Sequence, residues 1–378
     1  MTLFQSPETL NTSALFDEVT IGDLKLANRL VMAPLTRSRA NADGTANALM
    51  AEHYSQRAAA GLIVSESAYV SAQGKSAIKT PGLHTDAHIA SWRQVTDVVH
   101  ARGGRIFAQL VHAGRVSHHD LQPDGGAPVA PSRIAARAKT FTASGMVPCP
   151  VPRPLTGRQI QAAIGSFAHA AQAAAHAGFD GIELHAGNGY LVNQFLDSAA
   201  NQRSDRYGGS VANRIRFALE ALEAAAGALG PQRVGIRIAP WNAAFGMEPD
   251  DDDVLYPELV RSLPSDLAYL HVREVGDRPL TQRLRELWRG PLILNPHPGG
   301  PEAGAATVEQ ACQALSCGMA DAVCLGTLFL ANPDLPARIA AGGPYNEPDP
   351  TSFYQGGAAG YIDYPPLVQP DLTPAQAA

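Results

Sequence analysis

Residues 156–190, TGRQIQAAIGSFAHAAQAAAHAGFDGIELHAGNGY, contain one complete helix–strand unit. Thr156 and Gln159 have the spacing of a capping box at a helix N-terminus, and Gly178 is typical of a helix C-terminus. The apolar run Gly181–His185 follows directly, and a short run of this kind bounded by glycines indicates a buried strand. The stretch therefore predicts a crossover helix that leads into a strand of a parallel sheet.

The same unit recurs on both sides of this stretch. Eight apolar runs have the length of one strand: Leu30–Ala33, Leu62–Ser65, Arg105–Gln109, Gly181–His185, Val234–Ile238, Tyr269–Val272, Leu292–Leu294 and Asp321–Leu325. Helical periodicity separates most of them, and Thr307 with Gln310, and Asn332 before Pro333, predict two further helix starts. Eight alternating strands and helices predict an α/β fold, a single (β/α)8 TIM barrel.

Length and composition agree with one large barrel. The chain has 378 residues, 45% of them hydrophobic and 17% charged, which is an ordinary globular balance. We expect one domain over residues 1–378, with residues 1–15 and 366–378 as extended tails. Long loops are expected after strands three, five and seven, at residues 114–157, 239–253 and 295–306, and the first of these is long enough to form a lid or wall of a site.

Charge and targeting signals limit the possible partners. A formal net charge of −6 provides no basic surface for nucleic acid or an anionic membrane. The N-terminal residues lack the pattern of a secretory signal, and no apolar run is long enough to span a bilayer. Cys149, Cys312, Cys317 and Cys324 form no CxxC pair, so we expect free thiols, a cytoplasmic protein and no metal site. A small-molecule substrate is the expected partner, and the oligomeric state stays open.

Polar residues follow several of the predicted strands at the end where barrel enzymes place their active sites. Thr36 offers a hydroxyl, Gln109 an amide that both donates and accepts, and Arg237 a fixed positive charge. Together they indicate a flat, hydrogen-bonding cofactor that carries negative charge in one of its states.

The segment after the fourth strand carries groups for acid and oxyanion chemistry. His185 and Asn188 can both donate to one oxygen and stabilise negative charge on it. Tyr190 is a phenol that can deliver a proton. We therefore expect these three residues to be catalytic.

These residues belong to motifs that span nearly the whole chain. The motifs are KLANR at 25–29, APLTR at 33–37, ELHAGNGYLVNQFL at 183–196, NQRSDRYGGSVANRIRF at 201–217, GIRIAP at 235–240 and GGAAGYIDYP at 356–365. In these motifs the chain resembles the old yellow enzyme family of ene-reductases, which use FMN as cofactor and NADPH or NADH as reductant.

The resemblance implies a role for each matching position. Pro34, Thr36, Gln109 and Arg237 would hold the flavin ring, and Gly300 and Gly326 would lie at its phosphate. His185 and Asn188 would bind the carbonyl or nitro oxygen of an activated alkene. Tyr190 would protonate the α-carbon after the flavin N5 gives hydride to the β-carbon.

Two departures from the family pattern widen the expected substrate pocket. Val111 stands where a typical member has tryptophan, and Ala77 where tyrosine is common, while Tyr361 would still form a wall. Replacing two rings by small side chains predicts a bulky substrate.

A third departure concerns the phosphate. Thr327 stands where the family has arginine, and Asn295–Gly300 replaces a glycine-rich turn with about six additional residues. Loss of a charged, bidentate contact predicts weakened FMN binding.

Two other interpretations remain open on sequence alone. A barrel that has lost its flavin would act as a non-redox isomerase or cyclase on an enone, through Tyr190, His185 and Asn188. A catalytically inactive barrel that serves as a binding module is the third.

Overall fold

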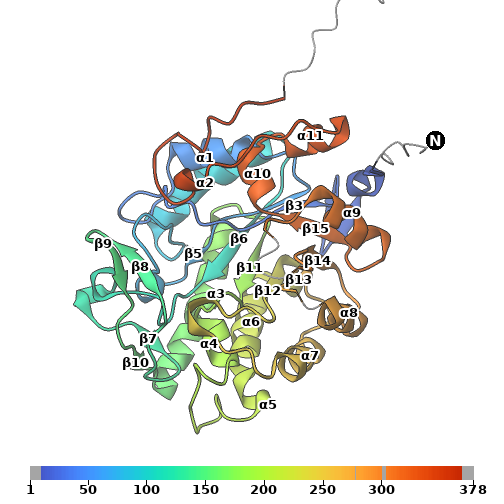
Figure 1. The fold of residues 1–378 in the computed structure, drawn as a ribbon. Coiled ribbons are helices and arrows are strands. Elements are labelled where there is room, and N and C mark those ends of the chain that lie inside the picture. The colour runs from blue at the N-terminus through green and yellow to red at the C-terminus, as the bar shows by residue number, and fades with distance from the viewer. Residues whose placement is uncertain (1–9, 277, 300–303, 368–378) are drawn as a thin grey trace, which may run out of the picture.

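Eight parallel strands close into a barrel in the computed structural model, which describes residues 10–276, 278–299 and 304–367 (Figure 1). The barrel strands are β3 (Leu30–Met32), β4 (Leu62–Val64), β6 (Ile106–Val111), β11 (Gly181–His185), β12 (Val234–Ile238), β13 (Tyr269–Arg273), β14 (Leu292–Asn295) and β15 (Ala322–Leu325). The last strand closes on the first, with Val323 opposite Leu30 and Leu325 opposite Met32. The predicted TIM barrel is confirmed.

Helices follow the strands and cover the outside of the barrel. They are α1 (Ala48–Ser55), α2 (Asp86–Ala101), α3 (Gly157–His176), α4 (Leu191–Leu196), α5 (Val211–Arg214), α6 (Arg216–Leu229), α7 (Asp252–Ser262), α8 (Arg278–Leu287), α9 (Val308–Ser316), α10 (Thr327–Ala331) and α11 (Leu335–Ala341).

Two of the three predicted helix starts are confirmed. Thr156 and Thr307 each form a complete capping box, with Gln159 and Gln310 respectively. The start expected at Asn332 is wrong, because α11 begins at Leu335 after Asp334. The Asn332 side chain instead accepts a hydrogen bond from the Asn346 amide at 2.7 Å, so it is occupied by the segment that follows the helix.

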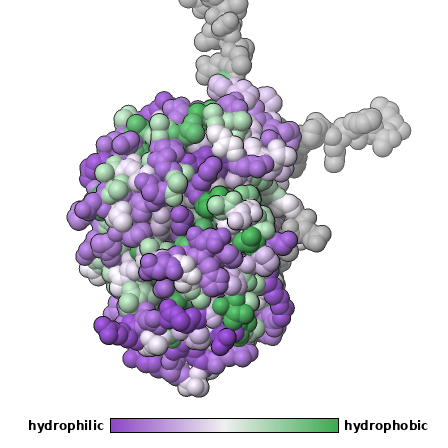
Figure 2. All heavy atoms as spheres, turned by 90° about the vertical axis from the view of Figure 1, so that its left-hand side faces the viewer, coloured by the Kyte–Doolittle hydropathy of each residue, from purple (hydrophilic) through white to green (hydrophobic). Residues whose placement is uncertain are grey.

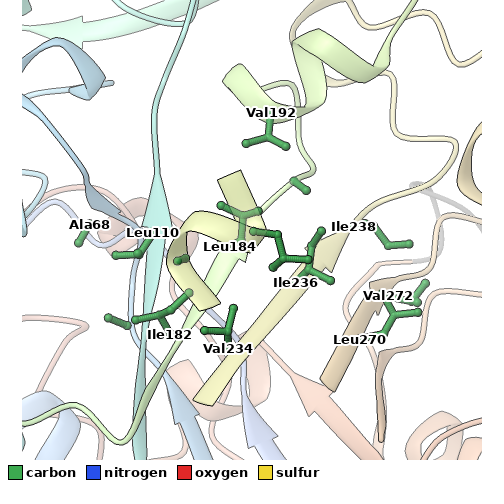
Figure 3. Packing of buried hydrophobic residues seen from close by; sticks show 14 of the residues in the cluster. Ala68, Leu110, Ile182, Leu184, Val192, Val234, Ile236, Ile238, Leu270 and Val272 are labelled. Carbon is green, nitrogen blue, oxygen red and sulfur yellow. The ribbon is translucent and has the colours of Figure 1, made fainter. Parts of the chain in front are cut away.

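Side chains of each barrel strand alternate between two cores. Ile182, Leu184, Val234, Ile236, Leu270 and Val272 belong to the outer core between strands and helices, and Figure 3 shows several of them packed together. Val31, Val64, Phe107, Tyr269 and Ile293 belong to a separate cluster inside the barrel. Residues two positions after the last apolar interior residue therefore point into the mouth of the barrel, at the carboxyl ends of the strands.

A hairpin closes the opposite, amino end of the barrel. Strands β1 (Val19–Ile21) and β2 (Leu24–Leu26) pair antiparallel, and Ile21 and Leu26 pack into the interior cluster. Gly22 at the turn has φ +57°, and a Cβ there would lie 1.9 Å from the Gln232 carbonyl oxygen. Only glycine fits this turn without a shift of the backbone.

The long segment after β6 forms a hairpin at the mouth of the barrel. It contains β7 (Val129–Ala130), β8 (Lys139–Thr142), β9 (Gly145–Pro148) and β10 (Arg153–Pro154), of which β8 and β9 pair antiparallel. The short β5 (Ala68–Tyr69) lies beside the end of β6, and the Phe141 carbonyl accepts from the Ile78 amide at 3.0 Å. Figure 1 shows β8 and β9 at one edge of the molecule, and Figure 2 shows that side as largely hydrophilic with separate hydrophobic patches.

The segment after α11 returns across the first part of the chain, over α1 and α2 (Figure 1). Arg39 donates to the carbonyls of Ser352 at 2.8 Å, Phe353 at 3.1 Å and Ala359 at 3.2 Å. Arg37 donates to the Gly360 carbonyl at 2.7 Å. Two buried arginines of the first βα loop thus fix the C-terminal segment.

The ends of the described chain are more ordered than two extended tails. Residues 13–15 belong to the 3-10 helix Ser13–Phe16, and Leu15 is fully buried, so the expected tail at 1–15 is wrong for these residues. Leu367 donates its amide to the Asp334 carboxylate at 2.5 Å. Residues 1–9 and 368–378 lie outside the described chain. None of the described helices is long and apolar enough to cross a membrane.

Candidate active site

A cavity of about 820 Å³ opens at the carboxyl ends of the barrel strands. It brings together nine of the residues singled out in the sequence: Pro34, Thr36, Ala77, Gln109, His185, Asn188, Tyr190, Arg237 and Gly326. They come from six different strands or the loops after them. Closure of the barrel is what places such distant residues around one cavity.

Two residues expected at the substrate pocket do not line this cavity. Val111 is buried in β6 opposite Tyr69. Tyr361 is fully buried and stacks on His53, with ring centroids 4.0 Å apart, while the guanidinium of Arg39 lies 4.9 Å from its ring centre. The expected wall at Tyr361 is wrong, because packing of the C-terminal segment on α1 takes its ring away from the cavity.

Aromatic residues of the same C-terminal segment line the cavity instead. They are Phe353 and Tyr354, and Tyr354 is 62% exposed. Sequence reasoning missed both, although Tyr354 lies only seven residues before Tyr361 in the same motif region. Gly300 lies outside the described residues.

A buried polar network fixes Gln109 in the floor of the cavity. Its amide nitrogen donates to Glu183 at 2.7 Å, and its oxygen accepts from the Ser67 hydroxyl. Glu183 also accepts from His271 at 2.7 Å. Burial alone would raise the pKa of the Glu183 carboxyl, but the hydrogen bond from His271 and the charge of Arg237 hold it below its usual value.

His185 is an uncharged donor at the edge of this network. It is 3% exposed and lines the cavity, and its Nδ1 has no hydrogen-bond partner among the described residues. Burial and the neighbouring positive charge of Arg237 lower the pKa of His185 to about 3. At neutral pH its imidazole is therefore neutral and carries one N–H.

The amide of Asn188 is oriented by a neighbour on the loop after β12. Asn242 accepts from the Ala244 amide through its side-chain oxygen at 3.0 Å, so its nitrogen is the donor to Asn188 Oδ1, at 2.6 Å. This contact leaves the Asn188 nitrogen with its two N–H groups for another acceptor. The residue has φ +57°, a conformation that asparagine adopts more readily than most residues.

Tyr190 lies beside these two donors. Its ring centroid is 5.4 Å from that of His185 and 5.7 Å from that of Phe245. Desolvation, and to a smaller extent Tyr354 and Cys149, raise the pKa of the Tyr190 phenol to about 12. The phenol therefore keeps its proton over the whole physiological range.

The loops after β14 and β15 form the other end of the cavity. Asn295, His297, Gly304, Ala305, Ala306, Gly326 and Thr327 line it there. Sequence reasoning looked for a glycine turn at 299–300, whereas Gly304, with φ +75°, is the glycine that faces the cavity. The sequence signal that could have identified Gly304 is its position three residues before Thr307, the residue that caps α9.

Charge around the cavity has one sign. Arg37, Lys139, Arg237 and Arg273 line it, and no carboxylate does so among the residues that the structure describes. Glu183, which binds Gln109 below the floor, is fully buried. The cavity therefore favours an anionic ligand or a ligand that gains negative charge.

Comparisons with known proteins agree with this arrangement. The model of the NADH:flavin oxidoreductase / NADH oxidase family matches residues 14–346. The chain is 40% identical over 356 residues to a protein of Leishmania infantum named a probable flavin mononucleotide-dependent alkene reductase, a match that covers 91% of this chain and 95% of that protein.

Solved structures give the same result. Morphinone reductase superposes with a TM-score of 0.88 at 42% identity, covering 94% of this chain and 96% of that one. An old yellow enzyme homologue from Zymomonas mobilis superposes with a TM-score of 0.89 at 37% identity, covering 94% of this chain and 100% of the other.

Proposed function

The chain belongs to the NADH:flavin oxidoreductase / NADH oxidase family, with the old yellow enzymes, and we propose that it reduces the C=C bond of a bulky α,β-unsaturated carbonyl or nitro compound with Tyr190 as proton donor. The more general function follows from the family. The protein is an FMN-dependent ene-reductase that takes its electrons from NADPH or NADH.

The residues around the cavity fit FMN. A flavin ring needs hydrogen-bond partners along one edge and gains negative charge on reduction, and the buried Nε of Arg237 has no partner among the described residues. Pro34, Thr36, Gln109 and Arg237 would hold the ring, and Gly326 would lie at the phosphate. When bound, FMN supplies the hydride that adds to the β-carbon of the alkene.

Two donors would bind the substrate oxygen. His185, with a neutral imidazole, and Asn188 both line the cavity. Neither the imidazole N–H of His185 nor the side-chain N–H groups of Asn188 donate to another described residue. Donors held in place before the reaction stabilise the negative charge that develops on a carbonyl or nitro oxygen. This pair would activate the double bond for reduction.

Tyr190 would then supply the proton to the α-carbon. Its phenol is protonated at neutral pH and lies against His185, so it is next to the site where the oxygen would bind. Nearness of a protonated phenol to the two oxyanion donors is the observation that carries the proposed role.

A Tyr190→Phe variant tests this role. Loss of a positioned acid slows such steps by roughly a hundredfold or more, so we expect enone reduction to fall by that amount while FMN reduction by NADPH proceeds at the wild-type rate. Tyr207→Phe is the matched control, because Tyr207 hydrogen-bonds Glu220 outside the cavity. An unchanged rate of enone reduction in Tyr190→Phe would remove this residue from the mechanism.

The proposed size of the substrate rests on what surrounds the oxygen site. The cavity of about 820 Å³ has to hold FMN as well as the substrate, so the proposed size rests on the cavity wall and not on this volume. Ala77 contributes only a methyl group to its wall, and Phe141 and Met146 of the β8–β9 hairpin line it with exposed apolar surface. A substrate with an extended apolar body would cover that surface.

An Ala77→Tyr variant tests the size. We expect it to keep activity on cyclohexenone and to lose activity on a polycyclic enone, measured as kcat/KM for each substrate. Ala143→Tyr, at the hairpin tip outside the cavity lining, is the control. If the wild-type protein reduced cyclohexenone but no larger enone, the proposed substrate class would be wrong.

A visible spectrum of the purified protein tests the redox chemistry directly. We expect a bound-flavin spectrum that bleaches with NADPH in the absence of oxygen and recovers when an enone is added. The alternative of a flavin-free isomerase or cyclase predicts a colourless protein that does not retain added FMN, and family membership does not favour it.

A further inference from the structure

Arg273 occupies the mouth of the barrel next to the loops after β14 and β15. It is the last residue of β13, in register with Asn295 at the end of β14. Tyr269 and His271, four and two positions earlier, both hydrogen-bond Glu183 inside the barrel, so Arg273 lies on the same inward face. Its side chain is partly buried and lines the cavity.

The guanidinium of Arg273 has no hydrogen-bond or ion-pair partner in residues 10–276, 278–299 and 304–367. The neighbouring carboxylate, Glu274, forms an ion pair with Arg278 at 2.8 Å. Desolvation and the like charge of Arg237 lower the pKa of Arg273. A partly desolvated cation beside a second cation is costly unless an anion binds between or beside them.

The loops where a barrel commonly holds phosphate carry no such charge. Those loops follow the seventh and eighth strands, here β14 and β15. Their cavity-lining residues within the described chain are Asn295, His297, Gly304, Ala305, Ala306, Gly326 and Thr327, without lysine or arginine. Burial is the main cause that lowers the pKa of His297, so this imidazole is neutral at neutral pH.

Other cations of the cavity are placed elsewhere or are occupied. Arg37 donates to the carbonyls of Phe353 and Gly360. Lys139 belongs to the β8–β9 hairpin, on a different part of the wall. Arg273 is therefore the cation on the strand next to β14.

We propose that Arg273 binds the phosphate of FMN, so that β13 supplies the positive charge that the loops after β14 and β15 lack. A guanidinium suits this task, because its planar fork can form two parallel hydrogen bonds to a phosphate. The inference rests on the FMN dependence stated above but not on the identity of the substrate.

Riboflavin separates a phosphate contact from a contact to the ring, because it has the same ring and no phosphate. Dissociation constants of FMN and riboflavin are measured by flavin fluorescence for the wild-type protein and for Arg273→Gln. We expect the FMN constant to rise about tenfold to a hundredfold, the usual effect of one lost charge-assisted contact, and the riboflavin constant to stay the same.

Three further variants make the test specific. Arg283→Gln removes a charge from α8, where Arg283 bonds the Asp253 carbonyl outside the cavity, and should leave both constants unchanged. Arg273→Lys keeps the charge and should lose less FMN affinity than Arg273→Gln. Adding Thr327→Arg to Arg273→Gln places a cation back at the phosphate end and should restore FMN affinity.

The outcomes distinguish the possible failures. If Arg273→Gln weakened FMN and riboflavin equally, Arg273 would hold the ring, and if it weakened neither, the phosphate charge would come from another residue. Either result would overturn the inference while leaving the enzyme's function intact. A wild-type protein that bound neither flavin would contradict the proposed function as well.

Discussion

At the scale of single residues, the orientation of one amide decides how the candidate site works. Asn188 presents N–H groups to the cavity because its oxygen accepts from Asn242, and Asn242 is itself fixed by the Ala244 amide. Asn242 also lines the cavity, but its side-chain nitrogen and oxygen are engaged with Asn188 and Ala244. It is a positioning residue.

An Asn242→Asp variant should therefore be worse than Asn242→Ala. Aspartate still accepts from Ala244 but offers a second acceptor to Asn188, which then turns its nitrogen toward residue 242 and its oxygen toward the substrate. We expect the larger fall in kcat for enone reduction in Asn242→Asp, with FMN affinity unchanged in both variants. Equal activity of the two variants would mean that the Asn188 amide is not oriented in this way.

The pH dependence of the reaction follows from His185 and Tyr190. Their pKa values of about 3 and about 12 lie on opposite sides of the working range, because burial disfavours the charged form of each group. We expect kcat for enone reduction to show no inflection from either group between pH 5.5 and 9. An inflection near pH 6.5 that vanished in His185→Asn would show that His185 titrates normally.

The same shift in His185 has a consequence for stability with a defined sign. Its pKa is lower in the folded protein than in the unfolded chain, so below about pH 6.5 the unfolded chain takes up the proton first. This group therefore destabilises the folded state progressively as the pH falls from about 6.5 toward 3.

Residues with a chemical role at a strand end could be predicted from sequence, whereas residues placed by loop packing could not. His185 and Arg237 end strands whose apolar pattern is clear, and the cavity contains both. Tyr361 and Tyr354 lie in one irregular segment, and packing on α1 together with the hydrogen bonds of Arg37 and Arg39 decides which ring turns toward the cavity. No periodicity in the sequence records those contacts.

At the scale of elements, the β8–β9 hairpin connects substrate size to the long loop after β6. Phe141 is 39% exposed and lines the cavity, while the hairpin is held to the second βα loop by the Phe141 carbonyl and the Thr140 hydroxyl. The hairpin is thus a fixed wall whose apolar side chain remains available to a ligand.

A Phe141→Ser variant should weaken the binding of bulky substrates selectively. It removes apolar surface that only a large substrate would cover, so we expect KM for a polycyclic enone to rise about fivefold to tenfold and KM for cyclohexenone to stay the same. The backbone contact to Ile78 is unaffected by the change. A parallel rise of KM for both substrates would place Phe141 at the oxygen site rather than at the body of the substrate.

A small error in one strand end explains why the sequence analysis missed Arg273. The predicted sixth strand stopped at Val272, one residue before Arg273, and the predicted third strand stopped at Gln109, two residues before the end of β6. Charged and polar residues at a strand end look like loop in a sequence, because burial of a charge inside a barrel mouth depends on its neighbours in space. The barrel itself was predictable because its alternating apolar runs are local.

At the scale of the whole molecule, the first βα loop and the last segment of the described chain form one structure. Arg39 is 4% exposed and bonds carbonyls at Ser352, Phe353 and Ala359, more than 300 residues away in sequence. When one partner of such a buried hydrogen bond is removed, the other partner is left buried without a hydrogen bond, and the folded state loses stability.

An Arg39→Ala variant should therefore affect both stability and substrate binding. We expect a loss of about 3 kcal/mol in the free energy of unfolding, and a raised KM because Phe353 and Tyr354 lose their anchor. Arg158→Ala, which removes an exposed arginine of α3, is the control. Denaturant unfolding and enone kinetics give the two readouts, and a change in neither would mean that the remaining contacts of the segment, including those of Arg37 and His53, hold it in place.

The late position of Phe353 and Tyr354 also has a consequence for the order of events during synthesis. Every barrel strand precedes Leu325, so a nascent chain can close its barrel while these two aromatic residues are still inside the ribosome. The cavity then lacks one side, and it gains that side only after Arg37 and Arg39 bind residues that are made more than 300 positions later. A nascent chain that has released β15 but not yet Phe353 and Tyr354 would hold the floor and the oxyanion donors of the site beside an open flank, so the segment after α11 is the last part of this cavity to be put in place.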